Sequence, residues 1–235
     1  MPDPEPSSRR VRILAGEVEA KSVTSRTVIP SARQGAWGAF QRVGEVIATV
    51  DRKLPAHGHE RQEVLTYGVE GFATVAIGDG PAQSLDPHTV VLLTSPTKTT
   101  HAISPARGST VRWVSLVVGL PDGSNGAVRA QWGRPTASAP QPDGSVVRRL
   151  VGAGTGVVSA SGLEASEIAF ASSGTSFLPV GHDRQAVVYA LSGRGQVDAQ
   201  PVEEGEAALV EESAGLGLHG RPGFRVILAT VPRSR

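Results

Sequence analysis

Hydrophobic residues along this chain occur in short runs that are separated by turn-forming residues. The runs are rich in Val, Ile and Thr, and Gly, Pro, Asp and Ser stand between them; examples are EVIATV, EVLTYGV, TVVLLT, VRWVSLVV, AVVYAL and FRVILATV. No segment sustains the 3.6-residue periodicity of an amphipathic helix. Many short strands at this spacing are typical of a barrel or a sandwich, so the pattern predicts an all-β protein.

Two segments of the chain are similar to each other. Residues 59–71 read HERQEVLTYGVEG and residues 182–193 read HDRQAVVYALSG, with one deletion between them. Both contain His, an acid, Arg and Gln, then a run with Val, a Tyr and a final Gly. Self-similarity of this kind predicts two copies of one β-fold.

The second copy lacks some of the polar groups of the first. Val180 and Ala186 stand where the first copy has His57 and Glu63. The second copy keeps His182 and has His219 as the counterpart of His101. These two histidines are either remnants of a lost site or a pair facing the interior of the second barrel.

Breaks in composition suggest the domain boundaries. Residues 1–10 are rich in Pro, Ser and charge, and predict a disordered tail. Residues 133–144 read GRPTASAPQPDG, with no aliphatic side chain larger than Ala, which is typical of a linker. We therefore predict a first domain over residues 11–132, a linker over 133–145 and a second domain over 146–235.

Composition and charge exclude several classes of function. The 235 residues include 23 Lys and Arg against 22 Asp and Glu, a net charge of +1, so no nucleic-acid footprint is expected. There is no Cys, which excludes disulfides, thiolate catalysis and iron–sulfur clusters. No run has the length of a membrane span or the pattern of a signal peptide, so we expect a cytoplasmic protein without a membrane partner.

Candidate chemistry gathers in the first copy. His57 and His59 are two residues apart, so on a strand both side chains leave the same face. If the strand continues, Glu63 and Tyr67 have the same parity and point into the barrel. His101 would reach the same point from a distant strand. Three imidazoles and one carboxylate with open positions suit Fe(II), and also Ni, Mn, Zn or Cu.

These residues resemble the cupin superfamily and, in detail, the pirin family of bicupins. The pirin signature HPHRGFETVTYVLEG is similar to HGHERQEVLTYGVEG over residues 57–71, and the second pirin segment PGDVQWMTAGSGIVHSE aligns without a gap to residues 87–103. The matched positions are His57, His59, Glu63, Thr66, Tyr67, Glu70, Gly71, Pro87, Val90, Thr94 and His101.

The resemblance implies both a fold and a set of activities. It implies two β-barrel cupin domains of the jelly-roll type, with a metal site in the first and a degenerate, metal-free second. Pirin-like proteins include ring-cleaving dioxygenases of the quercetinase type and redox-responsive nuclear co-regulators.

The chain departs from the pirin pattern at one ligand. Pirins supply a fourth ligand from a Glu two residues after the distal His, and Ile103 stands at that position. Either Glu63 completes a set of three His and one Glu, or the site is a three-His centre that lacks one negative charge. The second outcome predicts weaker metal binding or none.

These residues and the resemblance to pirins together lead to three hypotheses about function. The first hypothesis is an Fe(II)-dependent oxygenase that acts on a small aromatic or enolisable substrate, with Glu63 as ligand or general base and Tyr67 against the substrate. The second is a metal-free isomerase or cyclase that uses Glu63 and the histidines as acid and base. The third is a non-enzymatic regulator or sensor that binds a protein partner.

Overall fold

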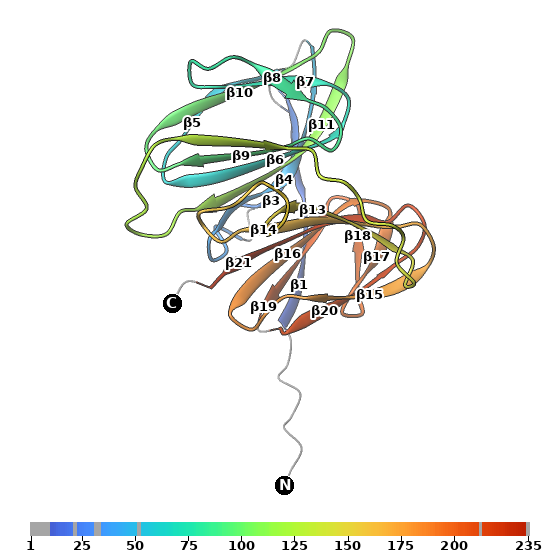
Figure 1. Ribbon diagram of the computed structural model, residues 1–235. Helices are drawn as coiled ribbons and strands as arrows, with labels where there is room; N and C mark the ends of the chain where they lie inside the picture. Colours follow the sequence, from blue (N-terminus) through green and yellow to red (C-terminus); the bar gives the residue numbers. More distant parts are fainter. Residues whose placement is uncertain (1–9, 21–22, 31–33, 51–52, 212, 234–235) are drawn as a thin grey trace. The chain divides into compact units, whose positions relative to one another are not determined.

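The computed structural model is built from β-strands joined by turns (Figure 1). It describes residues 10–20, 23–30, 34–50, 53–211 and 213–233. These residues contain no helix, and hence none long and apolar enough to cross a membrane. The predicted all-β class is confirmed. The tail predicted for residues 1–10 lies outside the described residues except for Arg10, which begins the first strand.

The chain forms two compact units, and neither is a continuous stretch of sequence. The N-terminal unit contains residues 16–135 and 150–163, and the C-terminal unit contains residues 1–15, 136–149 and 164–235. This division differs from the predicted boundaries at two points. Strand β1 (Arg10–Ala15) pairs with β19 (Glu206–Glu211) of the C-terminal unit, and residues 150–163 return to the N-terminal unit.

The N-terminal unit consists of two antiparallel sheets. The larger has the order β12-β9-β6-β11-β4-β3-β2, and its strands are Arg129–Gly133, Val90–Ser95, Gln62–Glu70, Thr110–Gly119, Phe40–Thr49, Thr24–Ile29 and Glu17–Ala20. The smaller has the order β5-β10-β7-β8, and its strands are Leu54–His59, Thr99–Pro105, Ala73–Ile77 and Gln83–Leu85.

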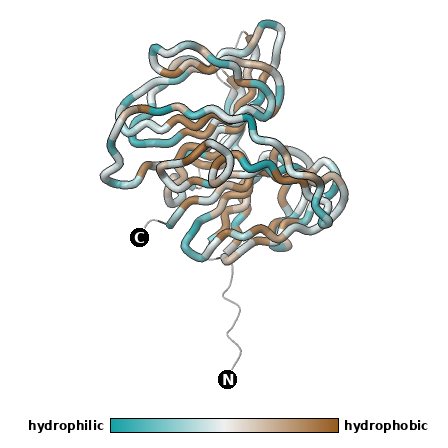
Figure 2. The backbone as a smooth tube through the Cα atoms, in the orientation of Figure 1, coloured by the Kyte–Doolittle hydropathy of each residue, from teal (hydrophilic) through white to brown (hydrophobic). Residues whose placement is uncertain are grey.

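The core of this unit lies between its two sheets. Val46, Val91 and Trp113 of the larger sheet pack in one cluster with Val75 and Ile103 of the smaller one. Alternate residues along a strand point to opposite faces, and the central strands β6 and β9 of the larger sheet are buried at consecutive positions, so both of their faces are covered. Full burial of each large apolar side chain stabilises the fold by roughly 1.5–3 kcal/mol, which holds the two sheets together. Figure 2 shows the hydrophobic positions following the strands.

The C-terminal unit repeats this architecture. Its sheets have the orders β1-β19-β16-β21-β14-β13 and β15-β20-β17-β18. Strand β16 pairs with β19 and β21, as β6 pairs with β9 and β11. The remaining strands are β13 (Ser145–Val151), β14 (Glu164–Phe170), β15 (Gly174–Pro179), β16 (Arg184–Ser192), β17 (Arg194–Val197), β18 (Gln200–Glu203), β20 (Gly215–Gly220) and β21 (Arg225–Pro232).

Apolar side chains fill the interior of the second barrel. Ala186 and Val180, which replace the polar groups of the first copy, are both buried in this core. His182 and His219 are exposed, and Nδ1 of His219 lies 2.9 Å from Oγ1 of Thr175. The described residues of this unit contain no cluster of metal-ligating side chains. We therefore locate the chemistry in the N-terminal unit.

Candidate metal centre

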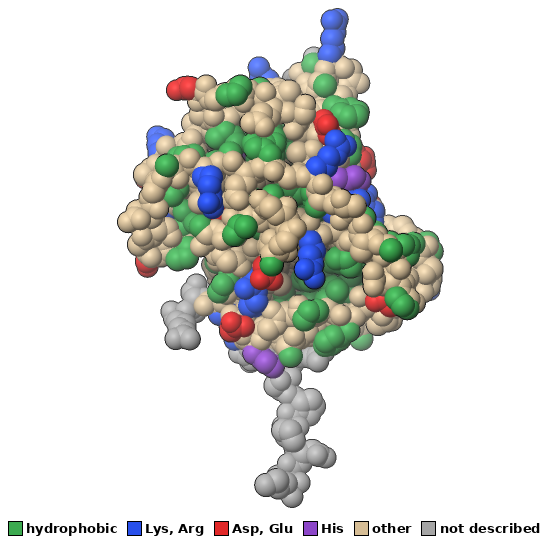
Figure 3. Space-filling view, in the orientation of Figure 1, with side chains coloured by type: hydrophobic (Ala, Val, Ile, Leu, Met, Phe, Trp, Pro, Cys, Tyr) green, Lys and Arg blue, Asp and Glu red, His purple; other side chains and the backbone are tan. Residues whose placement is uncertain are grey.

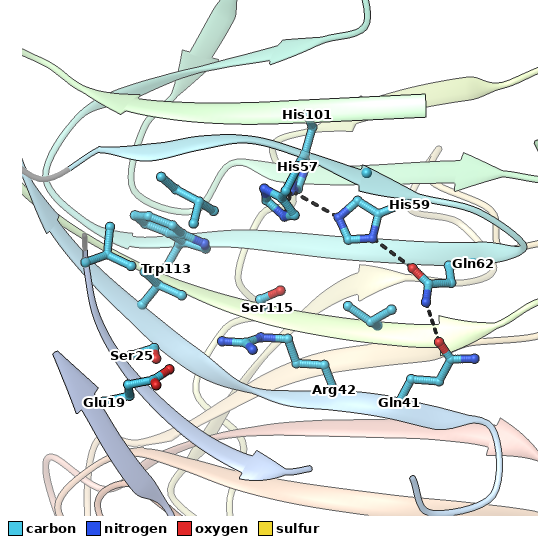
Figure 4. Close-up of a pocket in the computed structure, with 15 residues that line it drawn as sticks. Glu19, Ser25, Gln41, Arg42, His57, His59, Gln62, His101, Trp113 and Ser115 are labelled. Atoms are coloured by element: carbon cyan, nitrogen blue, oxygen red, sulfur yellow. Dashed lines mark hydrogen bonds between the residues drawn. The ribbon is translucent and has the colours of Figure 1, made fainter. Parts of the chain in front are cut away.

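Three histidines converge inside the N-terminal barrel (Figure 4). His57 and His59 lie on β5, and His101 lies on the adjacent strand β10, where it pairs with His57. Nε2 of His101 is 2.9 Å from Nε2 of His57 and 3.4 Å from Nε2 of His59. The structure thus brings together the three predicted imidazoles, and a ligand atom of each lies within 4.8 Å of the others.

Hydrogen bonds on the far side of two rings set their tautomers. Nδ1 of His57 is 3.0 Å from the carbonyl oxygen of Pro55, and Nδ1 of His59 is 2.8 Å from Oε1 of Gln62. Because these oxygens only accept, each Nδ1 carries the proton and donates it. Each Nε2 then presents a lone pair to the centre, which is the usual arrangement of metal-binding histidines.

Burial keeps His59 and His101 neutral. Desolvation, together with the neighbouring His57 and His59, lowers the pKa of His101 to about 3. Desolvation also lowers the pKa of His59, and the neighbouring His57 and the charge of Arg42 lower it further, whereas the hydrogen bond from its ring to Gln62 raises it. A cation at this position therefore does not have to displace protons from His59 or His101 at neutral pH.

Gln62 is a functional residue that the sequence reasoning missed. Its Oε1 accepts from His59, and its Nε2 donates to Oε1 of Gln41 on β4, so the amide is held in one orientation. The only signal in the sequence is the Gln that both repeat copies share, Gln62 and Gln185.

Replacing Gln62 with Leu is expected to weaken metal binding without removing a ligand. The variant frees the ring of His59 to rotate and to change tautomer. Loss of such an outer partner typically lowers metal affinity by a factor of about 10–100. Competition titration with a chelating dye measures the change, and Gln83→Leu, at an exposed position, is the control. An affinity equal to that of the wild type would contradict this role.

The structure corrects the expectation for Glu63. Strand β5 ends at His59 and β6 begins at Gln62 in the other sheet, and Arg61 between them has a positive φ of 54°. The strand does not continue, so the parity of His57 does not extend to Glu63. Gln62 faces the histidines, and Glu63 lies on the opposite face of β6.

The Glu63 carboxylate is instead bound by the returning segment 150–163. It accepts hydrogen bonds from the hydroxyls of Thr94 (2.7 Å), Ser159 (2.5 Å) and Ser161 (2.7 Å), and from the backbone N–H groups of Ala160 (2.9 Å) and Ser161 (3.0 Å). Burial alone would raise the pKa of Glu63, but these donors lower it. Glu63 is therefore an ionised structural group and contributes no atom to the histidine cluster.

Tyr67 shares the face of Glu63. Its side chain is fully buried, and its hydroxyl lies 2.8 Å from Nδ1 of His88. The described residues that line the histidine pocket do not include Tyr67, so Tyr67 is not placed to contact a molecule bound beside the histidines. Ile103 follows His101 on the same strand and is fully buried in the apolar core. Of the two outcomes open from the sequence, the structure thus shows a three-His cluster without a carboxylate.

The histidines line a cavity of about 540 Å³, a usual size for a small-molecule site. Its walls come from both sheets of the N-terminal unit. The apolar lining residues are Val23, Val46, Leu54, Trp113 and Val117, and the polar ones besides the histidines are Glu19, Ser25, Gln41, Arg42, Gln62 and Ser115.

Comparison with known proteins identifies the fold. No protein-family model matches the chain, and no curated protein matches it by sequence. Among solved structures, GK1651 from Geobacillus kaustophilus has a TM-score of 0.85 at 20% identity, covering 96% of each chain. A quercetin 2,3-dioxygenase from Acinetobacter baumannii has a TM-score of 0.83 at 17% identity, covering 95% of this chain and 79% of the other.

A third similar structure is the bacterial pirin YhhW from Escherichia coli in complex with nickel(II). Its TM-score is 0.82 at 12% identity, and the match covers 96% of this chain and 100% of the other. The chain therefore has a pirin-like bicupin fold, which confirms the fold expected from the resemblance in the sequence.

Proposed function

We propose that this pirin-like bicupin is a metal-dependent oxygenase acting on a small aromatic or enolisable substrate, with the metal held by His57, His59 and His101. The observation that supports the proposal is the convergence of three Nε2 atoms in a pocket of small-molecule size. The fold is shared with a quercetin 2,3-dioxygenase and with a pirin that binds nickel(II).

Three imidazole ligands suit a divalent ion of the first transition series. Fe(II) is our first choice, and Ni, Mn, Zn and Cu accept the same donors. When bound, such an ion would supply Lewis acidity and the redox chemistry of a reaction with dioxygen.

The protein's own residues bind and orient the substrate. Val46, Trp113 and Val117 form an apolar wall that can hold a planar molecule and exclude water beside the histidines. Gln41 and Gln62 fix His59, and Ser115 offers a hydroxyl to a substrate oxygen. Glu19, an exposed residue, is the acidic group among the described lining residues, because Glu63 faces away.

The two alternative functions receive less support. A metal-free isomerase that relies on Glu63 loses its acid–base group to the contacts with segment 150–163. A regulator is favoured by a large exposed patch, yet the exposed large hydrophobic residues among those described fall on separate segments, namely Val18, Val50, Phe72, Val158 and Phe177. On the face seen in Figure 3, basic and acidic side chains are interspersed.

Oxygen uptake by metal-loaded protein tests the proposal. After anaerobic loading with Fe(II) or Ni(II), we expect substrate-dependent oxygen consumption with a panel of flavonols, hydroxybenzoates and enolisable ketones. His57→Ala should lose this activity, because one of three ligands is gone. Wild-type protein that takes up metal but consumes no oxygen with any of these compounds would overturn the oxygenase assignment.

A further inference from the structure

We propose that the pocket selects a small organic acid, whose carboxylate pairs with Arg42 while a second oxygen of the molecule faces the three histidines. This inference deepens the proposed function and uses the same pocket. It assigns Arg42 as the specificity-determining residue.

Arg42 lies across the pocket from the histidines. It belongs to β4 of the larger sheet, whereas His57, His59 and His101 are on β5 and β10 of the smaller one. In Figure 4 its guanidinium end points into the pocket, near Ser115 and on the side facing Glu19 and Ser25. A molecule that spans the cavity would contact the histidines at one end and Arg42 at the other.

Arg42 differs from the other half-buried arginines of its sheet because no described residue holds its guanidinium by a hydrogen bond or ion pair, although the charge of Glu19 acts on it. Arg112 donates from Nε to Oε2 of Glu45 at 2.6 Å, and Nη1 of Arg26 is 3.1 Å from Oε1 of the same carboxylate. Arg42 makes no hydrogen bond or ion pair with any residue in the described part of the chain. A half-buried guanidinium is usually paired, so an unpaired one that faces a cavity indicates a missing anion.

The C-terminal unit follows the same rule. Glu167 binds Arg148, and it also accepts from Nη2 of Arg225 at 2.6 Å. In each unit, a buried carboxylate on the sheet thus compensates two arginines. Because the half-buried arginines beside Glu45 and Glu167 are each paired with a carboxylate, we interpret the guanidinium of Arg42, which has no such pair, as a functional feature.

The charge of the site also favours an anion. The three imidazoles are uncharged when they present Nε2 lone pairs, and Ile103 supplies no carboxylate. A divalent ion on these ligands together with Arg42 leaves the pocket strongly positive. Burial lowers the pKa of Arg42 and the charge of Glu19 opposes this, but Glu19 is exposed to water and makes no ion pair with Arg42. A ligand carboxylate would supply the negative charge that no described side chain places against Arg42.

The guanidinium of Arg42 can orient the bound acid as well as attract it. A guanidinium fork also fixes a carboxylate by two parallel hydrogen bonds, which orients the remainder of the molecule toward the histidines.

Paired binding measurements on salicylate and salicylamide test the inference, because the two molecules share their shape and differ in charge. Calorimetric titration is carried out on metal-free protein and on Ni(II)-loaded protein, whose metal content is measured separately. We expect salicylate to bind wild-type protein at least about tenfold more tightly than salicylamide. In Arg42→Met, salicylate should lose about tenfold or more in affinity while salicylamide binding stays unchanged.

The controls separate this inference from the metal centre. Arg107→Met removes an exposed arginine and should bind both ligands as the wild type does. Charge-selective, Arg42-dependent binding in a protein that takes up no metal would sink the oxygenase proposal and keep this one. Equal affinities for the two ligands, no binding of salicylate, or an unaffected Arg42→Met variant with native thermal unfolding would overturn it, even if metal binds.

Discussion

His101→Ala is expected to abolish metal binding while leaving the protein folded. His101 is the most buried of the three ligands, and its Nε2 lies between those of His57 and His59. Two imidazoles on one edge strand cannot close a coordination site, so metal content should fall from about one ion per chain to near zero. Elemental analysis after incubation with Fe(II) or Ni(II) and gel filtration measures the loss.

The exposed His182 provides the matched control for this experiment. His182→Ala removes an imidazole of the second copy and should retain the metal of the wild type. If His101→Ala kept its metal while circular dichroism showed a native fold, the three-His assignment would have to be abandoned.

Glu63→Ala is expected to destabilise the protein by about 3–5 kcal/mol. The substitution leaves Thr94 and the donors of residues 159–161 without their acceptor in a buried location. Denaturant unfolding measures the change, and Glu60→Ala, at an exposed position close by, should have little effect.

The loss of stability in Glu63→Ala should decrease as pH falls. Because the folded state lowers the pKa of Glu63, the stabilisation is present above the unfolded-state pKa and disappears as pH falls through the lower folded-state pKa. The difference in the free energy of unfolding between wild type and Glu63→Ala should thus be largest at neutral pH and should decrease in acid. Glu63→Gln with native stability but no bound metal would contradict the structural role and restore Glu63 as a ligand.

Features of the site that lie within one strand could be predicted from the sequence, and features that cross a turn could not. His57 and His59 could be placed on one face because they lie within one strand, where alternation is strict. Glu63 and Tyr67 could not, because the same count crossed a turn at Arg61 where the chain leaves one sheet for another. The place of His101 came from the resemblance to pirins, since strand pairing over such a distance leaves no periodic signal.

Other features of the site had no signal in the sequence. Arg42 reads as one of many charged residues on a strand, and its unpaired state is a property of the neighbours that folding brings to it. The return of residues 150–163 was also hidden, because a Gly- and Ser-rich stretch resembles any surface loop until its N–H groups are seen to bind a carboxylate.

The interleaving of the two units has a consequence for how this chain can be divided. Cutting it at the Pro-rich stretch 133–145 would separate Glu63 from residues 159–161 and β1 from β19. The N-terminal fragment would then contain the buried Glu63 carboxylate without its hydrogen-bond donors, and the C-terminal fragment would expose the edge of β19 that β1 covers. The two cupin domains thus repeat in sequence but cannot be separated by one cut. Exchange of one domain, in evolution or by engineering, would have to include segments from both sides of residues 133–145.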